Sequence, residues 1–314
     1  MNLHALSLSE KDLLPKDSLV WTNLIRLFIS NFDRKETTRT TYEKALRQWV
    51  YFLETTTRNP DINPVLEYKN YLINKKLSAY SISVYLSALK VFFGFLVERN
   101  IIRSNPAKSV RCPKKPLGRR DALTKDEALK LLSLSCDDTL ESLRNRAILW
   151  LLLFSGLRSF SVVKANIGDI RIADDKRLLH YQGKGRDSRD EFVVLNNEVY
   201  DVINNYLAKR GNISPESPLF ASLSDRNSGS RLTGQSIRMI INDFFVRAGI
   251  SRAEISCHSL RHSAISFALR GGAKIEEVRE LAGHSDINMT ASYVHCHDRL
   301  SNPAELSIRA YLNA

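Results

Sequence analysis

The chain has 314 residues, a formal net charge of +12 and 43% hydrophobic residues. This length suffices for two ordinary domains, each with its own core, and we expect two. The four cysteines form no C-x-x-C pair, which argues against a disulfide framework and against a zinc ribbon. The basic excess favours nucleic acid as the partner, although a basic enzyme with a solvated charged face has the same composition.

Targeting signals and membrane spans are not apparent in the sequence. Residues 1–10 lack the basic start and apolar centre of a secretory signal. The most apolar run, residues 148–154, is far shorter than the roughly 20 residues that a membrane span needs, and it is typical of a buried helix. We therefore expect a cytoplasmic protein without membrane contact.

Residues 19–103 have the apolar spacing of helices, with Leu24 and Phe28 on one face and Leu46 and Trp49 on another. We expect four or five short helices here. We also expect caps for three of them: a threonine of the run 37–41 for the second, Asn63-Pro64 for the third, and Ser78 or Ser81 for the fourth.

The stretch after these helices is basic and rich in proline. Residues 103–120 contain seven Lys or Arg, three prolines and no acid. Prolines keep a chain extended, so we expect a linker at 104–121 that lies along phosphates, or else a basic connector without a ligand.

A second helical domain is predicted from residue 122. Thr124 and Glu127 have the spacing of a capping box at a helix start. Residues 177–182 and 191–195 alternate in polarity and flank a turn-prone segment, which predicts a β-hairpin with Lys184 at its tip. Residues 302–305 have the pattern of a helix start ahead of a short tail, 301–314.

His258 and Arg261 are three residues apart, so on a helix their side chains share one face. Such a pair alone usually caps or solvates a helix. The pair gains significance from four other motifs that occur along the chain. In chain order they are Gly156-Leu157-Arg158, Gly183-Lys184-Gly185, Leu281-Ala282-Gly283-His284 and Thr290-Ala291-Ser292-Tyr293-Val294-His295.

These motifs resemble those of the tyrosine recombinase (phage integrase) family, and the resemblance extends over nearly the whole chain. It implies a mainly helical α+β protein: a SAM-like core-binding domain at 18–103, the linker, and a mixed α/β catalytic domain at 122–314. It implies double-stranded DNA as the partner and no cofactor or metal. The catalytic residues that it implies are Arg158, Lys184, His258, Arg261, His284 and Tyr293.

The chemistry of phosphodiester cleavage fits these residue types. Negative charge that develops on the phosphate oxygens requires fixed cations and donors, which Arg158, Arg261 and His284 would supply. The phenol of Tyr293 has an ordinary pKa of about 10 and needs a base, for which His258 is the candidate. Lys184 is the candidate acid for the leaving 5′ oxygen.

Several of these residues also have ordinary interpretations. Lys184 could belong to a merely solvated basic turn, and Tyr293 is one of eleven tyrosines. His295-Cys296-His297 could suggest a metal site, but adjacent residues of a helix point apart and no second cluster completes a tetrahedral set.

One position departs from the family pattern. The residue three after the first arginine is usually Glu or Asp, and here it is Ser161. A serine can form a hydrogen bond but carries no charge. We expect activity to remain, with room for a changed balance between cleavage and ligation, and we expect Ser161→Asp to cleave.

The resemblance predicts a site-specific recombinase that cleaves through a 3′-phosphotyrosine, acts as a homotetramer or with a paired recombinase, and exchanges strands through a Holliday junction. Two alternatives are a type IB topoisomerase-like enzyme and a catalytically weak DNA-binding protein. We expect no domain before the core-binding helices, as in compact Xer-type, plasmid, phage or transposon enzymes. The tail 301–314 would pack on a neighbouring protomer or on its own domain.

Overall fold

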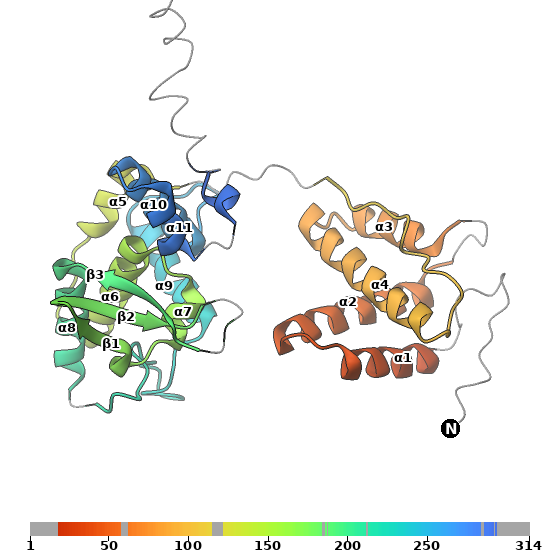
Figure 1. Cartoon of the computed structure of the whole chain (residues 1–314), viewed down its shortest axis with the longest axis horizontal. Coiled ribbons are helices and arrows are strands. Elements are labelled where there is room, and N and C mark those ends of the chain that lie inside the picture. The colour runs from red at the N-terminus through yellow and green to blue at the C-terminus, as the bar shows by residue number, and fades with distance from the viewer. Residues whose placement is uncertain are drawn as a thin grey trace, which may run out of the picture. The chain divides into compact units, whose positions relative to one another are not determined.

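The computed structural model describes residues 18–57, 62–114, 122–183, 186, 188–211, 213–283, 286–291 and 293. The chain divides into two compact units, Met1–Gly118 and Arg119–Ala314. The second unit combines helices with a small sheet, and the described part of the first is helical (Figure 1). The predicted fold class, mainly helical with a small β-sheet, is confirmed.

The described part of the first unit contains four helices: α1 (Ser18–Asn31), α2 (Glu36–Thr55), α3 (Pro64–Asn74) and α4 (Ala79–Glu98). Its core is rich in aromatic rings; Trp49, for example, meets Tyr68 edge to face, with the ring centroids 5.2 Å apart. By length and composition α4 could cross a membrane. Its buried side chains, Leu86, Leu89 and Phe92 among them, instead belong to the core of this unit.

Two of the three predicted caps in this unit are confirmed. The Asn63 side chain accepts from the backbone N–H of Val65 at 2.9 Å, ahead of Pro64, and Ser78 accepts from the N–H of Ser81 at 3.1 Å. The cap expected from the threonine run 37–41 is wrong. The helix α2 already begins at Glu36, so the threonines lie inside it, and Lys35 precedes it without a side-chain cap.

The segment that follows α4 packs on the first unit. Ala107 and Val110 are buried in its core, and the Asn63 side chain donates to the carbonyl of Pro106 at 2.9 Å. Small apolar residues between the basic ones make this packing possible. The packed part of the unit therefore extends past Arg103, into the stretch that we expected to be linker.

The described part of the second unit contains the α-helices α5 (Lys125–Leu132), α6 (Leu140–Ser155), α7 (Ser159–Lys164), α8 (Asn197–Arg210), α9 (Gly234–Arg247), α10 (Cys257–Arg270) and α11 (Ile275–Ala282), and residues 287–291 are helical as well. The predicted capping box at the start of α5 is confirmed: Thr124 accepts from the N–H of Glu127, and the Glu127 carboxylate accepts from the N–H of Thr124. The apolar run 148–154 lies in α6, which passes through the core of the unit.

The sheet of the second unit has three antiparallel strands in the order β1 (Ile170–Ala173), β2 (Lys176–Tyr181), β3 (Glu191–Leu195) (Figure 1). The predicted hairpin, β2 with β3, is confirmed, whereas β1 was not predicted. Along β3, Val193 and Leu195 are buried and Phe192 and Val194 are exposed. One face of the sheet therefore packs on the core, in which α6 lies.

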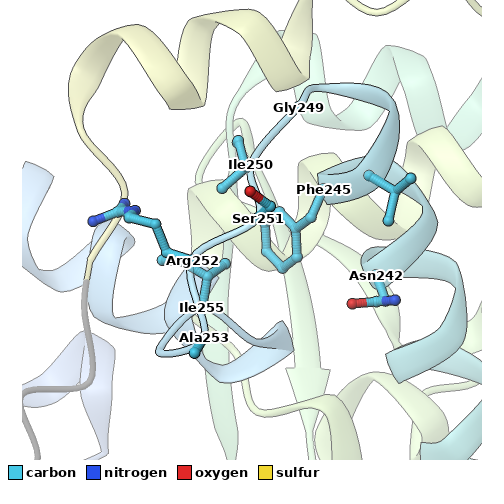
Figure 2. Close-up of a pocket in the computed structure, with 9 residues that line it drawn as sticks. Asn242, Phe245, Gly249, Ile250, Ser251, Arg252, Ala253 and Ile255 are labelled. Carbon is cyan, nitrogen blue, oxygen red and sulfur yellow. The ribbon is translucent and has the colours of Figure 1, made fainter.

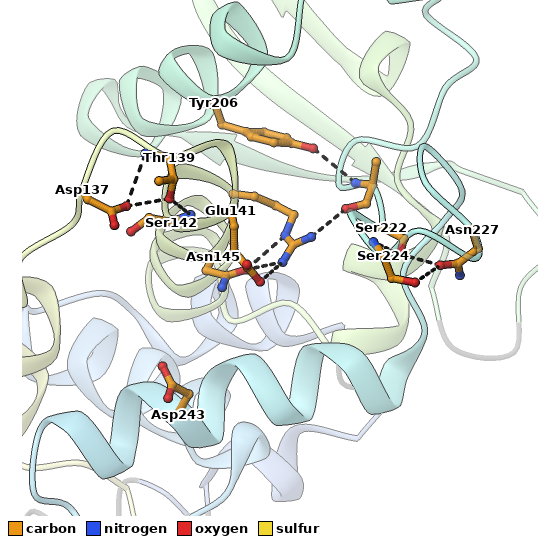
Figure 3. Close-up of polar contacts among 12 residues, drawn as sticks. Asp137, Thr139, Glu141, Ser142, Asn145, Tyr206, Ser222, Ser224, Asn227 and Asp243 are labelled. Carbon is orange, nitrogen blue, oxygen red and sulfur yellow. Dashed lines mark hydrogen bonds and ion pairs between the residues drawn. The ribbon is translucent and has the colours of Figure 1, made fainter.

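A polar cluster lies between α6, α8 and the segment 221–227 (Figure 3). Its centre is Arg144, which is 4% exposed and donates to the carbonyl of Ala221 at 3.1 Å, to Asn145 and to Glu141. The hydroxyl of Tyr206 accepts from the N–H of Ala221. Every polar group named here has a partner within the protein, which is what a buried charge requires.

Candidate active site

The Gly-Leu-Arg motif occupies the end of α6. Gly156 caps this helix in the left-handed conformation, with φ 62°, and a Cβ there would lie 3.3 Å from the Cβ of Ala264 in α10. A side chain is therefore disfavoured by both backbone and packing. Leu157 is buried, and Arg158 is the N-cap residue directly before α7. The motif thus places Arg158 beside α10.

His258 and Arg261 lie on α10, as predicted. Arg261 is 5% exposed, and its guanidinium donates to two backbone carbonyls, that of Gly156 at 2.6 Å and that of Ala282 at the end of α11. These bonds fix the guanidinium between the ends of two helices, where partial negative charge from the helix dipoles accumulates. In the described part of the chain Arg261 forms no ion pair with a carboxylate.

Burial and a neighbouring like charge have the largest effects on the electrostatics of Arg261. Burial and then the charge of Arg158 lower its pKa to about 10, against the opposing effect of Tyr293, Tyr181 and Glu191. Two guanidinium groups therefore lie close enough to repel each other. An anion that binds between them would relieve this repulsion.

Tyr293 lies in the same cluster. Its ring packs against the small apolar group of Ile265, Val278 and Ala282 from α10 and α11. Its hydroxyl forms a hydrogen bond with Nδ1 of His262, and the two rings stack at 5.2 Å. The direction of this bond depends on the tautomer of the imidazole.

His262 lies in this cluster and was not predicted from the sequence. It follows His258 by one helical turn, and the two rings meet edge to face at 5.0 Å. His258 therefore contacts the imidazole that contacts Tyr293. The signal was available in the sequence, since a histidine four residues after His258 on a helix must share its face.

Ser161, at the position usually occupied by an acid, is 2% exposed and donates from its hydroxyl to the carbonyl of Gln182 at 2.9 Å. Gln182 follows β2 directly and precedes Lys184 by two residues. An ionised carboxylate could not make this bond, because it has no proton to donate. The serine therefore ties α7 to the base of the hairpin turn.

The predicted features that lie outside the described residues are Lys184, His284, the segment with His295, and the tail 301–314 with its expected helix start. The structure thus brings Arg158, Arg261 and Tyr293 together, with His258 adjoining through His262. No group of three His, Cys, Asp or Glu side chains that could hold a metal ion occurs among the residues that the structure describes.

A pocket of about 340 Å³ lies elsewhere in the second unit, between the end of α9 and the loop that leads to α10 (Figure 2). Its lining includes Phe245, Ile250 and Ile255, together with Arg252, which pairs with Glu127 at 2.7 Å. None of the predicted catalytic residues lines it. The cluster around Arg261, and not this pocket, is the candidate active site.

Comparison with known proteins identifies the family of the chain. The sequence pattern of the phage integrase family matches residues 121–299, and that of the phage integrase N-terminal SAM-like domain matches residues 28–100. Tyrosine recombinase XerC of Myxococcus xanthus is 32% identical over 213 residues, which cover 66% of this chain and 69% of the relative. Tyrosine recombinase XerD of Rickettsia bellii is 30% identical over 234 residues, with coverages of 72% and 76%.

Solved structures share the fold at low sequence identity. The XerH site-specific recombinase, in a post-cleavage complex with a palindromic difH substrate, superposes with a TM-score of 0.70 at 18% identity, covering 91% of this chain and 94% of that one. The Tn1549 transposon integrase in complex with transposon right end DNA gives 0.69 at 17% identity, covering 87% and 94%. The chain belongs to the phage integrase family, the tyrosine recombinases, and is a site-specific DNA recombinase.

Proposed function

We propose that the hydroxyl of Tyr293 attacks a DNA phosphodiester at the recombination site. The new bond joins the phenolic oxygen to phosphorus, the bond from phosphorus to the 5′ oxygen breaks, and the products are a 3′-phosphotyrosine and a free 5′ hydroxyl. The observation that carries the proposal is the position of Tyr293 beside His262 and within electrostatic reach of the buried Arg261.

Arg158 and Arg261 bind the phosphate under attack. Each guanidinium can donate two hydrogen bonds to phosphate oxygens, and both remain charged at neutral pH. Burial, followed by repulsion from Arg158, lowers the pKa of Arg261 in the free protein, so a bound phosphate restores the charge balance of the site. Stabilisation then grows as the phosphate gains charge in the transition state.

The proton of Tyr293 passes to an imidazole. His258 is the candidate for this role from the sequence, and the hydrogen bond of Tyr293 makes His262 a second candidate. Both lie on one face of α10 in ring contact. Either can act as the base, because an ordinary histidine has a pKa near 6.5 and its neutral imidazole accepts a proton at pH 7. A phenol has a pKa near 10, so its proton is transferred only as the phosphorus is attacked, and the hydrogen bond must tighten at that point.

Lys184 protonates the leaving 5′ oxygen, and His284 donates to the same phosphate; both roles follow from the family resemblance. The bond energy stays in the phosphotyrosine link, so a 5′ hydroxyl from another strand can reverse the reaction without ATP. Strand exchange between two double-stranded sites in this way passes through a Holliday junction and needs four protomers. We further propose that this reaction takes place in the cytoplasm.

Covalent capture from a random DNA pool tests this proposal and identifies the DNA site in the same experiment. The full chain is incubated with a pool of nicked duplexes of random core sequence, protein-linked DNA is recovered under denaturing conditions, and the recovered DNA is sequenced. The expected result is one enriched site and an adduct through Tyr293 that mass spectrometry identifies. No adduct with the wild type, or an adduct with Tyr293→Phe, would contradict the proposal.

The enriched site then separates recombination from topoisomerase activity. Two duplexes of different length that carry this site, one of them labelled, should give recombinant lengths with the wild type. Relaxation of a supercoiled plasmid without recombinant products would favour the topoisomerase-like alternative.

A further inference from the structure

Glu191, the first residue of β3, lies at the active-site end of the sheet. In the strand register it is directly opposite Tyr181 of β2. Alternation along β3 places it on the same face as Val193 and Leu195, which are buried, and its own side chain is only 23% exposed. A carboxylate on the inner face of a sheet is unfavourable unless it has partners, because it loses hydration there.

The Glu191 carboxylate packs against residues that adjoin two predicted catalytic groups. A Cβ atom at Gly183 would lie 2.7 Å from both carboxylate oxygens, and one at Gly283 would lie 3.4 Å from Oε2. Gly183 directly precedes Lys184, and Gly283 directly precedes His284. Glycine at 183 is what allows the carboxylate to reach this position.

Charge and hydrogen bonding connect Glu191 to the rest of the site. Tyr181 is 4% exposed, and burial, followed by the charge of Glu191 and a hydrogen bond to its carboxylate, raises the pKa of Tyr181 to about 12. The hydroxyl of Tyr181 therefore remains a donor at physiological pH. Glu191 also favours the charged form of Arg261, and Arg186 pairs with its Oε1 at 3.1 Å.

We propose that Glu191 is a positioning residue that fixes the base of the β2–β3 hairpin against the active site and thereby places Lys184 for protonation of the leaving 5′ oxygen. Its Tyr181 partner lies on one strand of the hairpin, Glu191 lies on the other, and Gly183 at the start of the turn packs against the carboxylate. This inference rests on the proposed function, in which Lys184 is the acid.

A simpler role is that of an ion pair with Arg186, without influence on the chemistry. Asp190 provides the matched control, because it pairs with the same guanidinium at 3.0 Å and its side chain is about half exposed. Asp190→Asn removes one charge beside Arg186 in the way that Glu191→Gln does. A difference between the two variants therefore reports what Glu191 does beyond this ion pair.

The test compares two scissile linkages in the captured DNA site. One carries the ordinary 5′ oxygen, and the other a sulfur at that position. When the phosphorus–sulfur bond breaks, the sulfur leaves with the electron pair as a thiolate, which needs no proton because a thiol has a pKa of about 8.5. A defect in leaving-group protonation therefore disappears with the sulfur linkage, and a defect in attack or in phosphate binding does not.

Glu191→Gln should slow single-turnover cleavage of the oxygen linkage by about 10- to 100-fold, because small displacements of a catalytic group have effects of this size. The sulfur linkage should restore most of the rate, as it should for Lys184→Ala. DNA affinity should fall no more than about threefold, since a negatively charged carboxylate does not attract phosphate. Asp190→Asn should cleave like the wild type. Wild-type rates for Glu191→Gln, or an equal defect on both linkages, would overturn the proposal.

Tyr181→Phe gives a second route if Glu191→Gln folds poorly. It removes only the hydroxyl whose pKa the Glu191 carboxylate raises, and we expect the same selective defect at smaller size. The double variant should be no slower than Glu191→Gln alone, because both changes interrupt one interaction. Additive rate defects in the double variant would overturn the proposal. A wild type that forms no adduct would instead refute the proposed function, so the two failures are distinguishable.

Discussion

Two buried arginines of the second unit have nearly the same exposure and opposite surroundings. Arg144 is bonded to a carbonyl, to the amide of Asn145 and to the carboxylate of Glu141, and the charge of Glu141 opposes the lowering of its pKa by burial (Figure 3). Arg261 is bonded to two carbonyls, and the charge with the largest effect on it is that of another arginine.

This difference separates a structural cation from a functional one. A buried charge that has its partners within the protein contributes to the unique packing of its surroundings, and its removal leaves those partners without a donor. A buried charge with like charge beside it is held at a cost to stability. Such a cost is compensated when an external anion binds, which is the arrangement expected of a phosphate site.

The largest expected effect follows from Arg261→Lys. A lysine keeps the charge but loses the planar fork that bonds to carbonyls and phosphate together. Single-turnover formation of the covalent adduct should fall by about 100- to 1000-fold, the size expected when a transition-state donor is lost. A lysine can still donate to one of the two carbonyls, so the thermal midpoint of the free protein should fall less than in Arg144→Ala. A variant that unfolds but cleaves normally while folded would make Arg261 structural, like Arg144.

His262→Ala should have the next largest effect on cleavage. If the imidazole bonded to Tyr293 removes the phenolic proton, the adduct forms about 100-fold more slowly, within the range of general base catalysis. His258→Ala is the matched variant, one turn earlier on the same helix. A larger loss in His258→Ala, together with rescue of that variant at high pH, would assign the base to His258 and a supporting role to His262.

Arg144→Ala should show the converse behaviour. The carbonyl of Ala221 and the side chain of Asn145 lose their donor, so the free energy of unfolding should fall by about 2 kcal/mol. Well below the thermal midpoint, the rate of adduct formation per folded molecule should equal that of the wild type. Denaturant unfolding and single-turnover cleavage measure the two quantities. Loss of cleavage without loss of stability would break the contrast between the two arginines.

The smallest effect is expected for Ser161→Asp. The variant should still form the covalent adduct, because Arg158, Arg261 and Tyr293 are unchanged. An aspartate cannot donate to the carbonyl of Gln182, so its stability should fall by about 1 kcal/mol, the net value of one hydrogen bond. Ser161→Ala loses the same bond without adding charge and is the control. Complete absence of adduct in Ser161→Asp alone would make the serine a requirement of the chemistry.

Local features were predicted well from the sequence, because short-range chemistry determines them. The caps at Asn63 and Thr124 depend on residues at most three positions away, and the β2–β3 hairpin depends on alternation beside a turn-prone segment. The cap expected from the threonine run was wrong because tertiary context can override a local preference. The helix α2 begins at Glu36, before these threonines.

The sequence by itself determined the family and the identity of most candidate site residues, since motif order and spacing along the chain carry that information. Only the tertiary structure decided what surrounds them. The carbonyls that hold Arg261 come from Gly156 and Ala282, His262 reaches Tyr293 across 31 residues, and Glu191 faces Tyr181 through the strand register. Burial and charge at such a site depend on segments that are distant in sequence, and these interactions exist only once the chain has folded.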